Sequence, residues 1–149
     1  MSTTQNNKGE HLFLVLYKAS KAVETYDNRS IGELGFSSIS DFAVLEYLKT
    51  KGPQPVNTIG QSMMLTSGSM TTAVDRAQKN GYVTRERDPD DGRVVNVALT
   101  DKGREAIDNA FETHAANLER LFSVFDKEEK TEFVRLMKKI GKTAEALNL

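Results

Sequence analysis

Residues 82–102 of this 149-residue chain, YVTRERDPDDGRVVNVALTDK, are the most informative about its fold. Two runs rich in β-branched residues and arginine, 82–87 and 93–99, flank the turn residues 88–92, which is the pattern of a β-hairpin. In the second run Val95, Val97 and Leu99 alternate with smaller or polar residues, as in a strand that buries one face. The turn holds three aspartates that need water or partners, so we expect the tip of the hairpin to project into solvent.

Two helices are predicted immediately before the hairpin. Residues 66–81 fit a helix with Thr66 as its N-cap and Gly81 as the left-handed residue that ends it. A shorter helix over residues 56–63 follows a Gly-Pro-Gln-Pro break, with Pro55 at its first turn. Helix, turn, helix and arginine-edged hairpin in this order predict a winged helix-turn-helix, of the α+β class and mainly α.

The helix over residues 66–81 has a thin apolar stripe of Met70, Val74 and Ala77, which leaves its small polar residues facing outward. Small hydroxyl side chains near a helix N-terminus can enter a major groove and bond base edges or phosphates. The sequence therefore predicts a DNA-recognition helix.

Four motifs carry a resemblance to the MarR (multiple antibiotic resistance regulator) family of transcription factors. They are FAVLEYL from Phe42, LTSGSMTTAVDR from Leu65, NGYVTR from Asn80 and DPDDGRVVNVALTDKG from Asp88. The last is close to the wing signature of the family, in which an Asp-x-Arg tip leads into a strand that ends Leu-Thr-x-x-Gly. The resemblance spans roughly residues 38–104 by motif and implies a sequence-specific DNA-binding regulator, with double-stranded DNA as its partner.

We expect two groups of residues to contact DNA. The first lies on the recognition helix, where a purely solvated role is the alternative for the hydroxyls and helix packing is the alternative for Gly68; Arg76 could bind phosphate or pair with a neighbouring acid. The second lies on the wing, where Arg93 is the first choice for the minor groove and a structural pair with Asp91 is its alternative. The candidates are Ser67, Gly68, Ser69, Thr71, Thr72, Arg76, Arg85, Arg87 and Arg93.

Two positions depart from what the resemblance leads us to expect. Thr72 stands where many members have arginine, and a hydroxyl cannot make the bidentate contact to guanine that arginine makes. Gly92 stands where a basic residue is common, so this wing tip carries less positive charge.

The segments outside the winged domain fit helices with wide apolar faces. We expect a disordered N-terminus over residues 1–9, a helix and loop over 10–36 in which the loop spans 28–36, the winged domain over 37–100, and further helices over 101–149. Ser38 with Asp41, and Asp126 with Glu129, mark helix N-termini. Such wide apolar faces need cover that the winged domain does not offer, which predicts a homodimer built from the terminal helices, as the resemblance also implies.

The resemblance further implies that a small aromatic or phenolic effector binds between the winged domain and the dimerisation helices and lowers DNA affinity. Repression of a pseudo-palindromic operator is the expected mode, although the residues leave repressor and activator open. Residues chemically able to line such a crevice are His11, Phe13, Tyr17 and His114, each of which could equally be a core or interface residue. The alternatives are a regulator that responds to no ligand, or a winged-helix module that binds protein.

Composition excludes several other classes of protein. With no cysteine, disulfides and thiol redox sensing are excluded, and with two histidines and no evident acidic partner for either, we expect no metal, no cofactor and no enzymatic site. The net charge of -1 requires that any basic DNA-binding face be local. No run approaches the ~18 apolar residues of a membrane span and no signal peptide opens the chain, so we expect a cytoplasmic protein.

Overall fold

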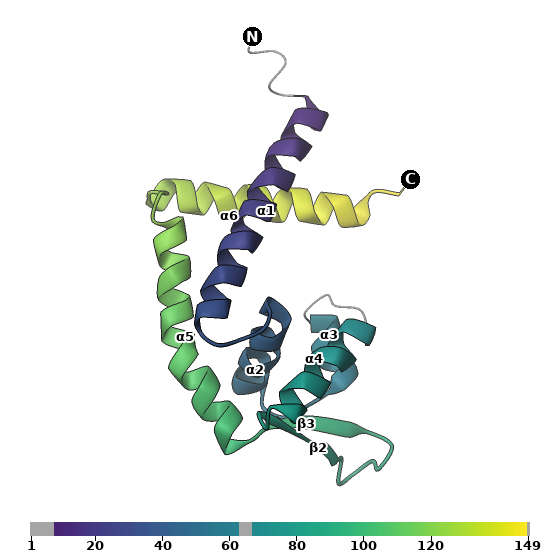
Figure 1. The fold of residues 1–149 in the computed structure, drawn as a ribbon. Helices are drawn as coiled ribbons and strands as arrows, with labels where there is room; N and C mark the ends of the chain where they lie inside the picture. The colour runs from purple at the N-terminus through teal and green to yellow at the C-terminus, as the bar shows by residue number, and fades with distance from the viewer. Residues whose placement is uncertain (1–7, 63–66, 149) are drawn as a thin grey trace. The chain divides into compact units, whose positions relative to one another are not determined.

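The computed structural model describes residues 8–62 and 67–148, which fold into two compact units, one up to His114 and the other from Ala115. Helices predominate, with one small antiparallel sheet (Figure 1). The elements in chain order are α1 (Gly9–Glu33), α2 (Ile39–Lys51), β1 (Gln54–Pro55), α3 (Val56–Ser62), α4 (Ser67–Lys79), β2 (Val83–Arg87), β3 (Val95–Leu99), α5 (Asp101–Phe122) and α6 (Lys127–Ala146).

The predicted hairpin is present as β2 and β3, which pair antiparallel with Arg85 opposite Val97. The sequence predicted the hairpin but not the third strand. The short β1 pairs with the other edge of β3, with Gln54 opposite Val97, so the strand order is β1-β3-β2. Pro53 and Pro55 made this segment look like a simple break, but an edge strand tolerates proline because one side of it needs no ladder bonds.

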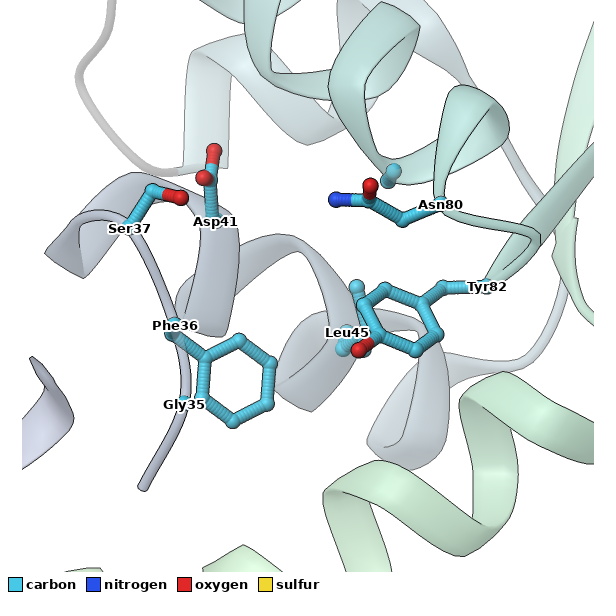
Figure 2. Close-up of a pocket in the computed structure, with 8 residues that line it drawn as sticks. Gly35, Phe36, Ser37, Asp41, Leu45, Asn80 and Tyr82 are labelled. Carbon is cyan, nitrogen blue, oxygen red and sulfur yellow. The ribbon is translucent and has the colours of Figure 1, made fainter. Parts of the chain in front are cut away.

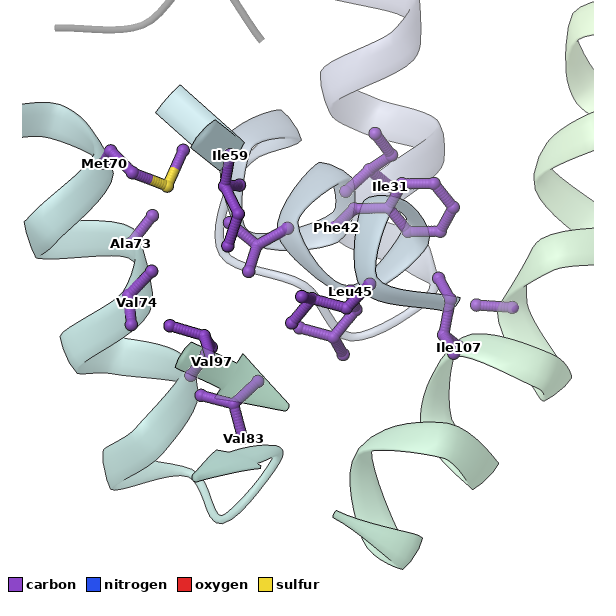
Figure 3. Close-up of a cluster of buried hydrophobic side chains, with 14 residues drawn as sticks. Ile31, Phe42, Leu45, Ile59, Met70, Ala73, Val74, Val83, Val97 and Ile107 are labelled. Atoms are coloured by element: carbon purple, nitrogen blue, oxygen red, sulfur yellow. The ribbon is translucent and has the colours of Figure 1, made fainter. Parts of the chain in front are cut away.

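A single core holds the helix-turn-helix and the hairpin together (Figure 3). Residues of α4 enter it at positions three and four apart, which is the spacing of one helix face. They pack with apolar side chains of α2, α3, the sheet and the start of α5. The fully buried members include Phe42, Leu45, Ile59, Met70, Val74, Val83, Val97 and Ile107.

The end of the first helix differs from the prediction. A loop was expected over residues 28–36, but α1 continues to Glu33 and only a short turn precedes α2. Burial explains the difference, because Ile31 is 1% exposed and packs in the core, which outweighs the low helix propensity of Gly32. The turn is made instead at Gly35, whose φ of 92° suits glycine.

Helix α1 begins at Gly9, within the segment 1–9 that was expected to be disordered. The predicted helix N-termini at Ser38 and Asp126 are confirmed. The amide of Asp41 donates to the Ser38 hydroxyl (3.3 Å), and Asp126 and Glu129 form a reciprocal capping box. Gly81, with φ of 77°, follows the end of α4 as expected. The proposed N-cap Thr66 lies outside the described residues.

Large apolar side chains remain exposed on α1 and α6 of a single chain. On α1 the exposed fraction is 56% for Leu12 and 61% for Phe13, and on α6 no residue is fully buried. Within the second unit, Phe122, Phe125 and Phe133 pack against one another with ring centroids 5.4–6.3 Å apart. Among the described helices, none is long and apolar enough to cross a membrane.

Candidate nucleic-acid interface

The outward side of α4 carries small polar groups. Gly68, Ser69, Thr71 and Thr72 are all exposed, whereas Met70, Ala73 and Val74 of the same helix are buried. We call these four exposed residues the hydroxyl face. Ser67 is the first residue of the same helix. The Thr72 hydroxyl donates to the carbonyl of Gly68 (2.9 Å), and its oxygen can still accept a hydrogen bond.

Arg76 is held by a carboxylate of another helix. Its Nε donates to both oxygens of Asp41 (3.0 and 3.1 Å), and its second terminal nitrogen donates to one of them at 2.7 Å. The side chain of Asp41 is only 12% exposed, and that of Arg76 is 41% exposed. This hydrogen bonding raises the pKa of the Arg76 guanidinium further above its usual value. Of the two roles foreseen for Arg76, the structure contains the ion pair.

Arg85 links the wing to α4. From the middle of β2 it donates to the Asp75 carboxylate (2.6 Å) and to the side-chain carbonyl of Gln78, both on α4. The sequence motifs gave no signal for this contact, because the two elements pair only once the hairpin folds against the helix.

The wing tip is organised by its own aspartates. Asp88 accepts hydrogen bonds from the backbone amides of Asp90 (2.8 Å) and Asp91 (3.1 Å) and from the side chain of Asn96 (2.9 Å). The Asp90 amide above all, then Asn96 and the Asp91 amide, lower the pKa of the Asp88 carboxyl below its usual value. Asp88 is therefore the acceptor around which the turn closes.

Two wing arginines lie beside this turn. Arg93 is almost fully exposed, at 92% of its side chain, and pairs with Asp91 (3.1 Å), which also accepts the Arg93 backbone amide. The guanidinium of Arg93 is the main cause that lowers the pKa of the Asp91 carboxyl. Arg87 donates to the carbonyl of Gly92 (3.1 Å). Arg93 is thus exposed to solvent at the tip of the wing, where Asp91 binds both its guanidinium and its backbone amide.

A tight junction joins the end of α4 to the start of α5. The Thr100 hydroxyl donates to the carbonyl of Gly81 (2.6 Å) and accepts the amide of Gly103 (3.0 Å), and Lys102 donates to the carbonyl of Asn80 (2.8 Å). A Cβ at Gly103 would lie 2.0 Å from the carbonyl oxygen of Tyr82. The Leu-Thr-x-x-Gly pattern was the sequence signal for this junction, and the close approach gives its physical reason.

The four effector candidates do not converge within one chain. His114 stacks on Phe42 with ring centroids 4.5 Å apart, and its Nε2 lies 2.9 Å from a carboxylate oxygen of Asp27. The sequence offered no evident acidic partner for either histidine, but the structure gives one to His114, namely Asp27, which is 87 residues away in sequence. Tyr17 lies ten residues before Asp27 on the same helix, about 15 Å along its axis, and His11 and Phe13 lie further still.

A pocket lies between the α1–α2 turn, α2 and the end of α4 (Figure 2). Figure 2 shows Asp41 and Asn80 on opposite sides of it, with Phe36 and Tyr82 nearby. None of the four effector candidates lines this pocket. No cluster of three potential metal ligands is found among the described residues.

Comparisons with known proteins agree with this arrangement. The sequence model of the MarR family matches residues 38–95. The HTH-type transcriptional regulator YkoM of Bacillus subtilis is 40% identical over 88% of this chain and 84% of its own length. The HTH-type transcriptional regulator MhqR of the same organism is 34% identical over 92% of this chain and 94% of its own.

The chain belongs to the MarR family. Two solved structures illustrate the shared fold. The reduced AbfR bound to DNA is 27% identical, with a TM-score of 0.73 over 97% of this chain and 99% of that one. The organohalide-sensing regulator RdhR-CbdbA1625 in its 2,4-dichlorophenol-bound form is 21% identical, with a TM-score of 0.79 over 96% of this chain and 85% of that one.

Membership of the MarR family makes this chain a DNA-binding transcriptional regulator with a winged helix-turn-helix. Its relatives are regulators and not enzymes. In this MarR-family fold α4 is the second helix of the helix-turn-helix, the position of a recognition helix. The hairpin of β2 and β3 is the wing.

Proposed function

We propose that the chain acts as a homodimer that represses transcription from a pseudo-palindromic operator and is released from it by a small aromatic or phenolic effector. The observation that carries the DNA-binding part is the hydroxyl face of α4, which is exposed while the opposite side of the helix is buried in the core. Small hydroxyls on a projecting helix can reach base edges and phosphates in a major groove.

In this proposal α4 reads the major groove and the wing follows the backbone to the adjacent minor groove. Ser67, Gly68, Ser69, Thr71 and Thr72 contact bases or phosphates from α4. Arg93 inserts into the minor groove, where narrow A·T tracts concentrate negative potential, because its guanidinium is nearly fully exposed. Arg85 and Arg87 bind phosphates at the base of the wing, and Arg85 must leave Asp75 to do so.

A second copy of the chain is the proposed cover for the apolar faces of α1 and α6. A monomer would leave Phe13, Leu12 and Ile140 about half exposed or more, which is unfavourable in water. An isologous dimer hides the same surface of both copies at once. Its two α4 helices then meet successive major grooves if they lie about 34 Å apart, which is one turn of B-form DNA.

The effector part of the proposal is supported by the 2,4-dichlorophenol in the structure of RdhR-CbdbA1625 and by the His114 environment. His114 lies on α5, and its polar side chain is only 12% exposed. It contacts Asp27 of α1 and packs on the ring of Phe42 of α2. Because the α1 candidates lie far along their helix from His114, a crevice that uses both groups would need residues of both copies.

Selection of duplexes from a random DNA pool, followed by fluorescence anisotropy across a series of salt concentrations, tests the DNA-binding proposal. We expect an enriched site with two inverted half-sites about one helical turn apart. Enrichment of a single half-site would contradict the dimeric mode. A chain that enriches no DNA, but captures protein through α4, would favour the protein-binding alternative.

The effector is tested by thermal unfolding with phenols, salicylates and quinones, in parallel with release of the selected duplex. A true effector raises the melting temperature, because it binds the folded chain, and also weakens DNA binding. A compound series with neither effect would favour a regulator that responds to no small aromatic ligand.

A further inference from the structure

The pair of Arg76 and Asp41 joins the two helices whose relative placement decides how α4 meets DNA. Asp41 stands in the first turn of α2, where its amide is held by the Ser38 hydroxyl (3.3 Å). Arg76 stands in the last turns of α4. Three hydrogen bonds of 2.7–3.1 Å connect the Arg76 guanidinium to both carboxylate oxygens of Asp41. Together they fix the orientation of the guanidinium as well as its distance from the carboxylate.

Arg76 would have to abandon this carboxylate in order to turn the same fork, Nε and one terminal nitrogen, toward a phosphate. Asp41 is 8% exposed as a residue, so its charge would then be left in a poorly hydrated place without a cation. Removing one partner of such a pair is costly, because the remaining charge keeps its desolvation penalty. The geometry therefore favours an arginine that remains on Asp41 when DNA is bound.

The hydroxyl face makes the position of α4 unusually important. Gly68, Ser69, Thr71 and Thr72 have short side chains or none, so they reach base edges only if the helix backbone itself lies close to the groove floor. A long arginine could compensate for a shifted helix by changing its rotamer. A serine or threonine hydroxyl cannot, so a small tilt of α4 would remove its contacts.

We propose that Arg76 is a positioning residue, which clamps α4 onto Asp41 of α2 so that the hydroxyl face reaches the bases, and that it does not bind DNA itself. This inference rests on the proposed role of α4 in reading DNA. It predicts that the pair contributes to discrimination between sequences. The inference also predicts that the number of phosphate contacts does not depend on the pair of Arg76 and Asp41.

Two single variants, the double variant that combines them and one control test the proposal, each compared with the unaltered full-length chain. Asp41→Asn removes the carboxylate charge, and Arg76→Lys keeps the positive charge but loses the bidentate fork. Asp108→Asn is the matched control, because Asp108 of α5 pairs with Lys49 of α2 and its loss changes the net charge by the same amount as Asp41→Asn. Anisotropy is measured with the duplex selected by the unaltered chain and with a scrambled duplex, over several salt concentrations.

We expect Asp41→Asn and Arg76→Lys each to weaken binding to the selected duplex about tenfold and to leave binding to the scrambled duplex within about twofold. The slope of log affinity against log salt should not change, because no phosphate contact is lost. The double variant should be no weaker than the worse single variant. Asp108→Asn should bind as the unaltered chain does.

Variants that keep or gain affinity for the selected duplex would overturn the proposal. If Arg76 binds phosphate and Asp41 merely restrains it, Asp41→Asn should bind the selected duplex as tightly as the unaltered chain or more tightly, and Arg76→Lys should keep its affinity. If Asp41→Asn does not fold by circular dichroism, Arg76→Lys alone decides between these outcomes. An unaltered chain that selects no DNA overturns the proposed function and this inference together, whereas the results above overturn the inference alone.

Discussion

Gly103 lies where the first turn of α5 passes the backbone of Tyr82. The missing side chain is what permits this approach, since a Cβ there would lie 2.0 Å from the Tyr82 carbonyl oxygen. The same carbonyl accepts the amide of Thr100 (3.0 Å), so it cannot move away without losing that bond. The glycine is thus required by contact between two backbones.

We predict that Gly103→Ala lowers the free energy of unfolding by about 2 kcal/mol or more, because the backbone of the junction must shift to admit a methyl group. Urea unfolding followed by circular dichroism measures this. Gly32→Ala is the matched control, since a Cβ at this helical glycine meets nothing within 4 Å. It should be neutral or stabilising by up to about 1 kcal/mol. Equal effects of the two substitutions would contradict the contact explanation.

Arg93 is the most exposed of the arginines in the described ion pairs, and its role can be tested independently of the fold. We predict that Arg93→Ala weakens binding to the selected duplex by more than about 1 kcal/mol and lowers the salt slope by about one unit. Anisotropy across salt measures both quantities. Arg135→Ala serves as the control, because Arg135 pairs with Glu132 on α6, away from the winged domain in sequence. Unchanged affinity and slope would exclude Arg93 from the DNA contacts.

At the level of elements, ionised aspartates organise the turn at the tip of the wing, whereas Val83 and Val97 of its strands are buried in the core. Asp88 accepts hydrogen bonds from two backbone amides and from the side chain of Asn96. Asp91 accepts hydrogen bonds from the backbone amide and the guanidinium of Arg93. Both carboxyls have their pKa lowered in the folded wing. A lowered pKa means that the ionised form is favoured by folding, so the stabilisation is complete above the usual value of 3.8 and is lost as the pH falls through the folded pKa.

We therefore predict that the wing turn opens on acidification below the usual aspartate range while remaining closed at neutral pH. The backbone amide resonances of Asp90 and Asp91, followed by NMR from about pH 6 to about pH 2, should shift together as Asp88 gains its proton. In Asp88→Asn this transition should disappear. Amides that remain in their neutral-pH positions at the lowest pH would show that the turn closes without the carboxylate.

At the level of the whole molecule, the terminal helices α1 and α6 each carry large apolar side chains that are exposed. Leu16 lies on the apolar stripe of α1 and is 39% exposed, while Lys18 lies two residues on and roughly 200° around the helix. The proposed dimer would bury Leu16 and leave Lys18 exposed to water.

We predict that Leu16→Glu weakens dimerisation by roughly 100-fold or more, because burying an unpaired carboxylate costs several kcal/mol. Sedimentation equilibrium over a range of concentrations measures the dissociation constant, and affinity for the selected duplex should fall with it. Lys18→Glu, which places the same group on the other side of α1, should remain dimeric. A Leu16→Glu chain that sediments like the unaltered one would place the interface elsewhere.

Patterns in the amino-acid sequence were enough to predict the local elements of this MarR-family chain. Hydrophobic periodicity, turn residues and caps act over a few residues, so the hairpin of residues 82–99, the caps at Ser38 and Asp126 and the exposed side of α4 could all be inferred from neighbours in the chain. The contacts between residues that are distant in sequence became known only from the folded chain. The pairing of Arg76 with Asp41, of Arg85 with Asp75 and of His114 with Asp27, the added strand β1 and the extension of α1 to Glu33 all depend on packing between segments far apart in sequence. Local patterns carry no information on such packing, because a charged side chain looks the same in sequence whether its partner is solvent, DNA or another helix.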